Sequence, residues 1–338
     1  MSIPAAHING RISVPPFLRS IEAELRRVEE ILSAELSSSA VRTVAAVASH
    51  VLEAGGKRLR PSLVALSSRA CGEGFDADRL VNVAASAELI HMATLMHDDV
   101  IDGADFRRGQ VTANSFWGNQ VSVLAGDYML AKAFSLLARD GDGRIMQALS
   151  RATIAMAEGE IGQIESRGDT RALAAHYLSI IRDKTAAFMS ACCRIGAILA
   201  DGSASAEETL AQYGLDLGLA FQITDDLLDL IGDPVKTGKP VGGDIREGKV
   251  TMPLILALEK ARPADRAALE RIMQGDSVTA DDVEFVRELV QAGGAVEGTR
   301  DVAVRYIGRA VGSLQALPVS AARDSLEQLA DCILLRES

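Results

Sequence analysis

Two acidic clusters with the same spacing are the residues in this chain best suited to chemistry. The first comprises Asp98, Asp99 and Asp102, and the second comprises Asp225, Asp226 and Asp229. Both follow apolar helical runs, so the outer acids of each cluster lie one turn apart, while the middle acid is rotated by about 100°. Converging carboxylates suit Mg²⁺, which leaves its other positions for water and phosphate oxygens. One such cluster could be a solvated helix end, but two favour a metal site.

Basic residues accompany the acids and indicate an anionic ligand. Arg107 and Arg108 follow the first cluster, and Lys236, Lys239 and Lys249 follow the second. A third basic group stands where a helix is expected to begin and backbone N–H groups also favour anions, and it comprises Lys57, Arg58 and Arg60. Acids and cations together predict a pocket in which Mg²⁺ bridges carboxylates to a diphosphate.

Charge and composition exclude several classes of protein. The 338-residue chain has a net charge of −11, which argues against nucleic acid as a partner. Bound Mg²⁺ can reverse the local field, so a diphosphate ligand is still compatible with that charge. There is neither a signal-peptide pattern nor an apolar run near 20 residues, so we expect a cytoplasmic protein without a transmembrane segment. Four cysteines form no paired motif and are interpreted as buried thiols: Cys71, Cys192, Cys193 and Cys332.

Periodicity and composition predict an all-α fold. Hydrophobic residues make up 48% of the chain and aromatics only 4%, alternating runs are rare, and helix-forming Ala, Leu, Glu and Arg are abundant. Pro61 suits the first position of a helix. No linker divides the chain, so residues 1–338 are expected to form one domain, with 1–17 flexible. Other helices are expected at 17–37, 40–54, 88–102, 114–139, 144–166, from 169–171 onward, and at 253–261, 264–273, 280–292, 296–316 and 320–335.

The motifs and their order resemble the all-trans polyprenyl diphosphate synthases across roughly residues 50–335. The matching segments are Gly-Gly-Lys-Arg-Leu-Arg-Pro (55–61), Leu-Ile-His (89–91), His-Asp-Asp-Val-Ile-Asp (97–102), Arg-Arg-Gly (107–109), Gly-Asp-Tyr-Met-Leu-Ala (126–131), Lys-Thr (184–185), Phe-Gln-Ile-Thr-Asp-Asp-Leu-Leu-Asp (221–229), Gly-Lys-Pro-Val-Gly-Gly-Asp (238–244) and Glu-Gly-Lys-Val-Thr-Met-Pro (247–253). Medium- and long-chain members, including the large subunit of heptaprenyl diphosphate synthase, are the most similar. They share Gly242-Gly243-Asp244 where many members carry Gly-Asp-Asp.

The resemblance implies a bundle of antiparallel helices around a deep central cavity, the isoprenoid synthase fold, and it assigns site residues. The diphosphate of isopentenyl diphosphate is assigned to Lys57, Arg60, His91 and Arg108. The allylic diphosphate is assigned to Arg107, Lys184, Thr185, Gln222 and Lys239, of which all but Arg107 are implied to be catalytic. Mg²⁺, expected as three ions with substrate bound, is assigned to Asp98, Asp102 and Asp225, with Asp99, Asp226 and Asp229 completing the clusters.

The implied reaction is head-to-tail prenyl transfer. The allylic diphosphate leaves, the double bond of isopentenyl diphosphate attacks the allylic cation, and a proton is lost to the departed diphosphate. Resemblance also connects product length to the positions one to two turns before Asp98. Bulky aromatics stand there in short-chain members, whereas Ala93 and Thr94 are small. We therefore expect a product of about six to ten isoprene units, of the kind used for quinone side chains, with a short-chain product as the alternative.

Other classes stay open as alternatives. A terpene cyclase would carry an Asn/Ser/Glu motif in place of the second acid cluster, and a head-to-head synthase would show more widely spaced Asp pairs. A non-catalytic subunit of a heteromeric synthase would lack intact clusters. The resemblance implies a homodimer, with a small accessory subunit as a further possibility.

Overall fold

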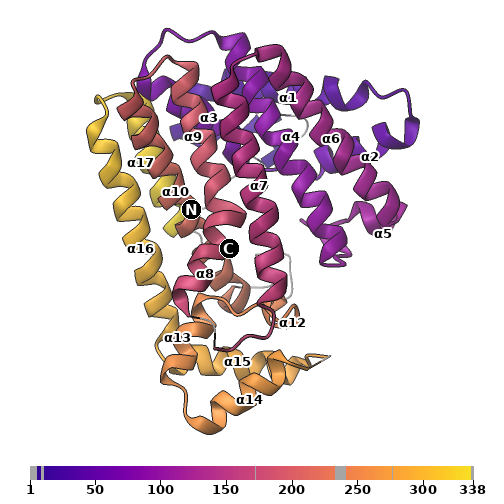
Figure 1. The fold of residues 1–338 in the computed structure, drawn as a ribbon, viewed down its shortest axis with the longest axis vertical. Coiled ribbons are helices and arrows are strands. Elements are labelled where there is room, and N and C mark those ends of the chain that lie inside the picture. Colours follow the sequence, from indigo (N-terminus) through magenta and orange to yellow (C-terminus); the bar gives the residue numbers. More distant parts are fainter. Residues whose placement is uncertain (1–5, 9–10, 172, 233–240, 276, 336–338) are drawn as a thin grey trace.

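The computed structural model describes residues 6–8, 11–171, 173–232, 241–275 and 277–335, which form a bundle of helices (Figure 1). The described strands make two short antiparallel hairpins, β1 with β2 and β3 with β4. The all-α prediction is confirmed. The segment 233–240, which contains Lys236 and Lys239, lies outside the described residues.

The elements follow one another with short connections. The first half contains β1 (Ala6–Ile8), β2 (Arg11–Ser13), η1 (Pro16–Ile21), α1 (Glu22–Ser37), α2 (Arg42–Glu53), α3 (Leu59–Cys71), α4 (Ala77–Ile101), β3 (Phe106–Arg107), β4 (Gln110–Val111), α5 (Ala113–Trp117), α6 (Asn119–Asp140) and α7 (Gly143–Glu165). The second half contains α8 (Ala174–Ile181), η2 (Arg182–Ala186), α9 (Ala187–Leu199), α10 (Ala204–Ile231), α12 (Gly243–Arg246), α13 (Met252–Lys260), α14 (Pro263–Met273), α15 (Ala280–Ala292), α16 (Ala295–Ser313), η3 (Leu314–Ala316) and α17 (Ala321–Leu334).

Helix α4 is a core helix that carries the first acid cluster at its end. It is packed against α1, α3 and α6, and most of its side chains from Leu80 to Met96 are buried. A helix that is apolar on every face belongs in the interior of a protein. Asp76 caps its first turn by accepting hydrogen bonds from the backbone N–H groups of Asp78 and Arg79. Packing along its whole length therefore fixes where its last turn places the acids.

Helix α10 carries the second acid cluster and joins two apolar clusters. It packs against α9 and α16 in the main bundle. Near its C-terminal end, Leu227 and Leu230 are buried in a second apolar cluster with residues of α12, α13, α14 and α15. Figure 1 shows these short helices gathered at one end of the bundle. The second acid cluster is thus held at the boundary between the long helices and this smaller group.

Two predicted helix starts and one predicted continuous helix differ in the structure. Helix α3 begins at Leu59 rather than at Pro61, because Arg58 takes the left-handed conformation (φ 46°) and the chain turns there. Pro61 is still within the first turn, where a missing N–H does no harm. The helix expected over 114–139 is divided into α5 and α6 at Gly118 (φ 83°). The helix expected from 169–171 begins at Ala174.

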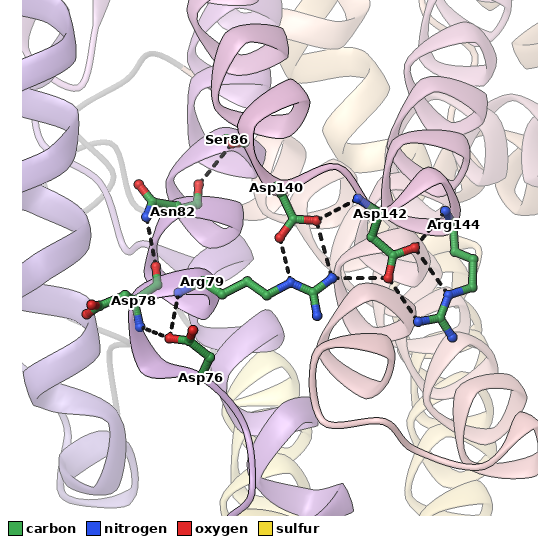
Figure 2. Close-up of polar contacts among 8 residues, drawn as sticks. All are labelled: Asp76, Asp78, Arg79, Asn82, Ser86, Asp140, Asp142 and Arg144. Atoms are coloured by element: carbon green, nitrogen blue, oxygen red, sulfur yellow. Dashed lines mark hydrogen bonds and ion pairs between the residues drawn. The ribbon is translucent and has the colours of Figure 1, made fainter.

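A charged clamp joins the start of α4 to the turn between α6 and α7 (Figure 2). Arg79 Nε donates to Asp140 Oδ1 at 2.6 Å, and its Nη2 donates to Asp142 Oδ2 at 3.0 Å. Asp142 also caps α7 by accepting from the Arg144 backbone N–H at 2.9 Å. The Asp140 side chain is only 3% exposed, so its negative charge depends on Arg79. The clamp lies at the opposite end of α4 from Asp98.

We expect Arg79→Ala to lower the free energy of unfolding by about 2 kcal/mol, because it leaves the buried Asp140 carboxylate without its bidentate partner. The figure is below that for a fully buried pair because Arg79 is itself 29% exposed. Urea denaturation measures the effect. The matched control is Arg26→Ala, which removes an exposed ion pair with Glu22 one turn away and should change stability by less than about 0.5 kcal/mol. Equal effects of the two substitutions would contradict the clamp.

Candidate active site

Lys249 lies close to both acid clusters, because its charge acts on Asp102 of the first cluster and on Asp226 of the second. Asp98 lies in the last turn of α4 and Asp102 caps that helix, while the second cluster lies in the last turns of α10. Lys249 Nζ is 3.9 Å from Asp102 Oδ2 and also forms an ion pair with Glu247. Burial works against the charged form of this lysine, but Glu247, Asp244 and Asp102 outweigh it and raise the pKa of Lys249. The structure therefore brings the separated clusters to one place.

The middle acids point away from their neighbours, as the helical spacing predicts. Asp99 Oδ1 accepts a hydrogen bond from Arg107 Nε at 2.6 Å. Asp226 Oδ1 accepts from Gln222 Nε2 at 2.7 Å, and its other oxygen accepts from the Tyr177 hydroxyl. These two carboxylates orient other side chains of the site.

Asp229 is engaged with the backbone that follows the second cluster. Its two carboxylate oxygens accept from the N–H groups of Gly243 and Asp244 at 3.2 and 3.0 Å. Both donors lie in the first turn of the short helix α12. Asp229 thus links α10 to the segment that carries Asp244.

The acids of the site are buried, and the nearby cations and hydrogen-bond donors do not fully offset the effect of burial on their pKa values. Burial raises the pKa of Asp98 to about 6, with Lys184 and Arg107 opposing the rise and Glu160 and Asp102 adding to it. Burial likewise raises the pKa of Asp226 to about 6 against the hydrogen bonds from Tyr177 and Gln222. The pKa of Asp244 is raised well above its usual range by burial and by Asp226 and Asp229. Added positive charge would relieve this repulsion.

The donor set fits a hard divalent cation. Asp102 Oδ1 and Asp244 Oδ2 are buried and accept no hydrogen bond, although Arg167 Nη2 lies 3.5 Å from the former. Carboxylate oxygens of this kind are the ligands Mg²⁺ prefers. Within the described part of the chain, no three Asp, Glu, His or Cys side chains are already grouped as a metal-binding cluster. Mg²⁺ bound by one or two carboxylates would keep its other positions for water and phosphate oxygens.

The Lys-Thr pair lies in a π-helical turn, η2, between α8 and α9. The Lys184 ammonium donates to Gln163 Oε1 at 2.6 Å and pairs with Glu160. Thr185 Oγ1 donates to Gln222 Oε1 at 2.9 Å, which connects this turn to the second acid cluster through Gln222. Wider turns of this kind occur mostly at functional sites, because they re-aim side chains.

A pocket lies beside the first acid cluster, between α2, α4 and the β3–β4 hairpin. His91, Arg107 and Arg108 contribute to its lining. Burial and the charges of four nearby arginines, Arg60, Arg108, Arg107 and Arg58, hold the pKa of His91 well below its usual range. A neutral His91 can donate to an anion, and the arginines supply the charge. The pocket is suited to a phosphate-bearing ligand.

Two of the four residues predicted for isopentenyl diphosphate line this pocket, and two do not. His91 and Arg108 lie in its wall, whereas Lys57 and Arg60 are not part of the lining. Arg60 is close enough to act on His91, and its Nε is buried without a hydrogen bond. Burial lowers the pKa of Arg60 while the charges of Glu88 and Asp225 raise it. Arg60 therefore lies between the pocket and the second cluster.

For several residues of the site the sequence predicted no role or a different one. Arg58, which lies between two predicted ligands in the sequence, is 3% exposed and pairs with both Glu29 and Glu88 at the wall of the pocket. Glu88 lies within the apolar run of α4, where its charge influences Arg60 and Arg108. Tyr177 reaches Asp226 from a distant helix. Only the unusual acid in an apolar run, at Glu88, could have been detected beforehand.

The predicted chain-length residues lie directly before the first cluster. Thr94 is half-buried, and its Oγ1 donates to the His91 carbonyl at 2.8 Å. It lies one turn before Asp98 and so on the same face of α4. Ala93 is 1% exposed. It shares a face with His97, whose imidazole lies against Gly126 of α6, so Ala93 is directed toward the α6 side of the bundle.

Comparison with known protein families decides the assignment, because the polyprenyl synthetase family matches residues 41–290. The chain belongs to the polyprenyl synthetase family. It is therefore a prenyltransferase, and the resemblance inferred from the motifs is confirmed. The matched range contains both acid clusters, the π-helical turn and the arginine-lined pocket.

Several polyprenyl synthetases of known name are similar over nearly their whole length. An octaprenyl diphosphate synthase of Escherichia coli is 36% identical over 304 residues, covering 90% of this chain and 93% of that protein. A heptaprenyl diphosphate synthase component 2 of Geobacillus stearothermophilus is 36% identical over 313 residues, covering 93% of each. A short chain isoprenyl diphosphate synthase of Methanothermobacter thermautotrophicus is also 36% identical, over 315 residues that cover 91% of this chain and 95% of that protein.

The fold is shared with a solved polyprenyl synthase from Caulobacter crescentus, whose crystal structure contains calcium and isoprenyl diphosphate. It has a TM-score of 0.91 and 39% sequence identity, with 95% of this chain and 97% of that chain covered. The isoprenoid synthase fold implied by the motifs is thereby confirmed. A divalent cation and a diphosphate are bound together in that relative.

Proposed function

We propose that this polyprenyl synthetase condenses isopentenyl diphosphate head-to-tail with an allylic diphosphate and releases a medium- or long-chain prenyl diphosphate. The observation that carries the proposal is the meeting of the two acid clusters beside an arginine-lined pocket. The acids suit the metal-dependent departure of one diphosphate, and the pocket suits the binding of a second without metal. Two adjacent sites for phosphate-bearing ligands are what a reaction between two diphosphates requires.

Asp98, Asp102 and Asp225 are the residues that would hold Mg²⁺, with three ions proposed when substrate is present. Bound there, Mg²⁺ supplies Lewis-acid and template chemistry toward the leaving diphosphate. Asp99, Asp226 and Asp229 support the site by holding Arg107, Gln222 and the start of α12. The cations of the chain complete the neutralisation of the leaving group.

The other side chains of the site have separate roles toward the two substrates. Arg107 and Lys184 direct fixed positive charge at the departing diphosphate, and we assign the same role to Lys239. The linked oxygens of Thr185 and Gln222 turn their negative dipole ends toward the allylic cation. His91, Arg108, Arg60 and Lys57 hold isopentenyl diphosphate so that its double bond attacks that cation. The proton released on closing the new double bond passes to the departed diphosphate.

Separate Michaelis constants for the two substrates test these assignments. Lys57→Ala and Arg60→Ala are expected to raise the Michaelis constant for isopentenyl diphosphate by roughly 10- to 100-fold, the loss of one charge-assisted hydrogen bond. Lys239→Ala should instead raise that for the allylic substrate. Lys260→Ala, on an exposed helix end far from the acids in sequence, is the control and should change neither. The opposite pattern in steady-state kinetics would show that the two substrate assignments are reversed.

We further propose that the chain forms a homodimer through α6 and α7. Helix α6 exposes an apolar face that includes Val123, Leu124 and Phe134, and α7 exposes Ile154 and Ile161. Large exposed apolar residues at helical spacing on two neighbouring helices favour burial in an interface. Among the described residues, α6 is also the one helix whose length and apolarity would permit a membrane crossing. We assign its exposed face to a second copy of the chain, which is consistent with the proposed cytoplasmic location.

Sedimentation measures the assembly directly. Sedimentation of the wild-type protein should give a molar mass twice the 35.8 kDa of one chain. Leu124→Glu should dissociate the dimer, because it would bury a charge at the contact. Gln120→Glu, at the exposed N-terminal end of α6, is the control for added charge alone. Because one relative is named as component 2 of a two-part enzyme, a dimer that lacks activity alone would support the proposed accessory subunit.

A further inference from the structure

His50 of α2 is attached to the hairpin that forms one wall of the arginine-lined pocket. Its Nε2 lies 2.7 Å from the Val111 carbonyl oxygen. Because a carbonyl oxygen can only accept, this nitrogen carries the proton. The imidazole also stands edge-on to Trp117 of α5, with ring centroids 5.2 Å apart. A single side chain thus joins α2 to the hairpin and to the helix that follows it.

The hairpin presents Arg107 and Arg108 to the pocket from a tight turn. Arg108 and Gly109 have φ values of 53° and 77°, both in the region that a two-residue hairpin turn requires. A non-glycine residue keeps such a conformation only where its surroundings fix it. Val111 is paired with Phe106 across the hairpin, in the second residue pair from this turn. The position of the Val111 carbonyl therefore determines where the turn and its arginines stand.

Three contacts fix the hairpin, and two of them come from α2 and the residues that directly follow it. The Arg108 guanidinium donates to the carbonyl of Gly55, just beyond the end of α2. His50 fixes the second strand from the same helix. Arg107 has an independent anchor, the Asp99 carboxylate on α4. Loss of the His50 contact would release the Arg108 side of the hairpin while Arg107 keeps its attachment.

We propose that His50 is a positioning residue for isopentenyl diphosphate, and that its hydrogen bond to Val111 sets the place of Arg108 in the pocket. The inference rests on the proposed assignment of this pocket to that substrate. His50 lines the pocket with His91 and Arg108, so it acts at the wall where the diphosphate binds. Its effect is specific to one substrate, since the acid clusters that hold the other are carried by α4 and α10.

A residue that merely filled space would behave differently. Its loss would lower the melting temperature and affect both substrates or neither. Loss of a positioning residue raises the Michaelis constant for isopentenyl diphosphate and leaves that for the allylic substrate nearly unchanged. Restoring an N–H donor at the same place should restore the affinity. These differences make the two roles separable.

The test uses three variants of the full chain. His50→Leu keeps the volume against Trp117 but removes the donor, and His50→Gln keeps a donor of comparable reach. Arg108→Ala checks the assignment of the pocket. Michaelis constants are measured for both substrates. Because Trp117 is the chain's single tryptophan and contacts His50, its fluorescence, titrated with isopentenyl diphosphate in EDTA, also reports binding without metal or turnover.

We expect His50→Leu to raise the Michaelis constant for isopentenyl diphosphate about tenfold, because it removes one hydrogen bond that positions Arg108 for the charged ligand. The midpoint of the fluorescence titration should move by the same factor. The allylic constant should stay within about twofold, and His50→Gln should recover most of the affinity. Equal increases for both substrates, or no increase in a folded His50→Leu protein, would overturn the proposal.

The Arg108→Ala variant separates the two possible failures. If it raises the constant for isopentenyl diphosphate while His50→Leu does not, the role of His50 is wrong and the pocket assignment stands. If it leaves that constant unchanged, the pocket assignment is wrong and the role of His50 falls with it. Should His50→Leu melt below the assay temperature, His50→Asn, whose amide is too short to reach Val111, replaces it under the same criteria.

Discussion

Asp98→Ala and Asp225→Ala should each reduce turnover by roughly 10³-fold or more, which corresponds to about 4 kcal/mol of lost transition-state stabilisation. Each carboxylate heads one of the two clusters that lie close to Lys249. Neither contributes to apolar packing, and Asp98 is held at a raised pKa of about 6 by its burial. Removing either one takes away a negative charge of the site and leaves the buried apolar side chains of α4 and α10 in place. Helix content should therefore be unchanged.

Single-turnover measurements at saturating Mg²⁺ give the rate of the chemical step, and circular dichroism gives the helix content. Asp331→Ala, on the exposed face of α17, removes an acid of the same kind far from the site and serves as the control. Asp99→Ala is informative beside them, since its effect should pass through Arg107 and so appear mainly in the allylic Michaelis constant. Near wild-type rates for Asp98→Ala would exclude this residue from metal binding.

Thr94→Phe should shorten the product to about three or four isoprene units. Thr94 is half-buried, and it lies one turn before Asp98 on the same face of α4. A tail that grows away from the acid cluster along this helix must pass it. The phenylalanine side chain is much larger than that of threonine, and a packed interior cannot yield to it without strain. Reversed-phase chromatography of the dephosphorylated products measures the length.

Ala93→Phe is the partner experiment. It was expected from the sequence to shorten the product, but Ala93 is buried toward α6, where an aromatic ring would also press the two helices apart. We therefore expect a shorter product together with a lower melting temperature, whereas Thr94→Phe should alter length with little loss of stability. Ala93→Ser, which hardly changes volume, is the control and should keep the wild-type length. A wild-type product of farnesyl or geranylgeranyl length would contradict the length argument for both positions.

The sequence was informative where chemistry and periodicity coincide. Helical spacing placed Asp98 and Asp102 together and turned Asp99 aside, and the structure shows Asp99 turned to Arg107. The order of motifs led to the fold and the family. Spacing along one helix carries such information because 3.6 residues per turn fix which side chains share a face.

Relations between distant segments could not be derived in this way. Arg58 has the same chemistry as its neighbours Lys57 and Arg60, and nothing local distinguishes a buried structural arginine from a ligand. Its role depends on Glu29 and Glu88, which reach it from two other helices. The link from His50 to Val111 spans 61 residues and ends on a backbone atom. No side-chain pattern records a backbone acceptor, so contacts of this kind need coordinates.

The π-helical turn at 182–186 has a consequence for how this chain tolerates length changes. A π turn is an α-helix that has accommodated one additional residue. The wider turn absorbs that residue, whereas deleting one residue from the regular helix α9 just after it would rotate α8 and η2 by about 100° relative to the rest of α9. Tyr177 would then leave Asp226, and Lys184 would leave Gln163, although no active-site residue had been replaced. Along this helix an insertion or deletion is therefore more damaging than most substitutions. Activity depends on the number of residues in the helix, because that number fixes the direction of each active-site side chain.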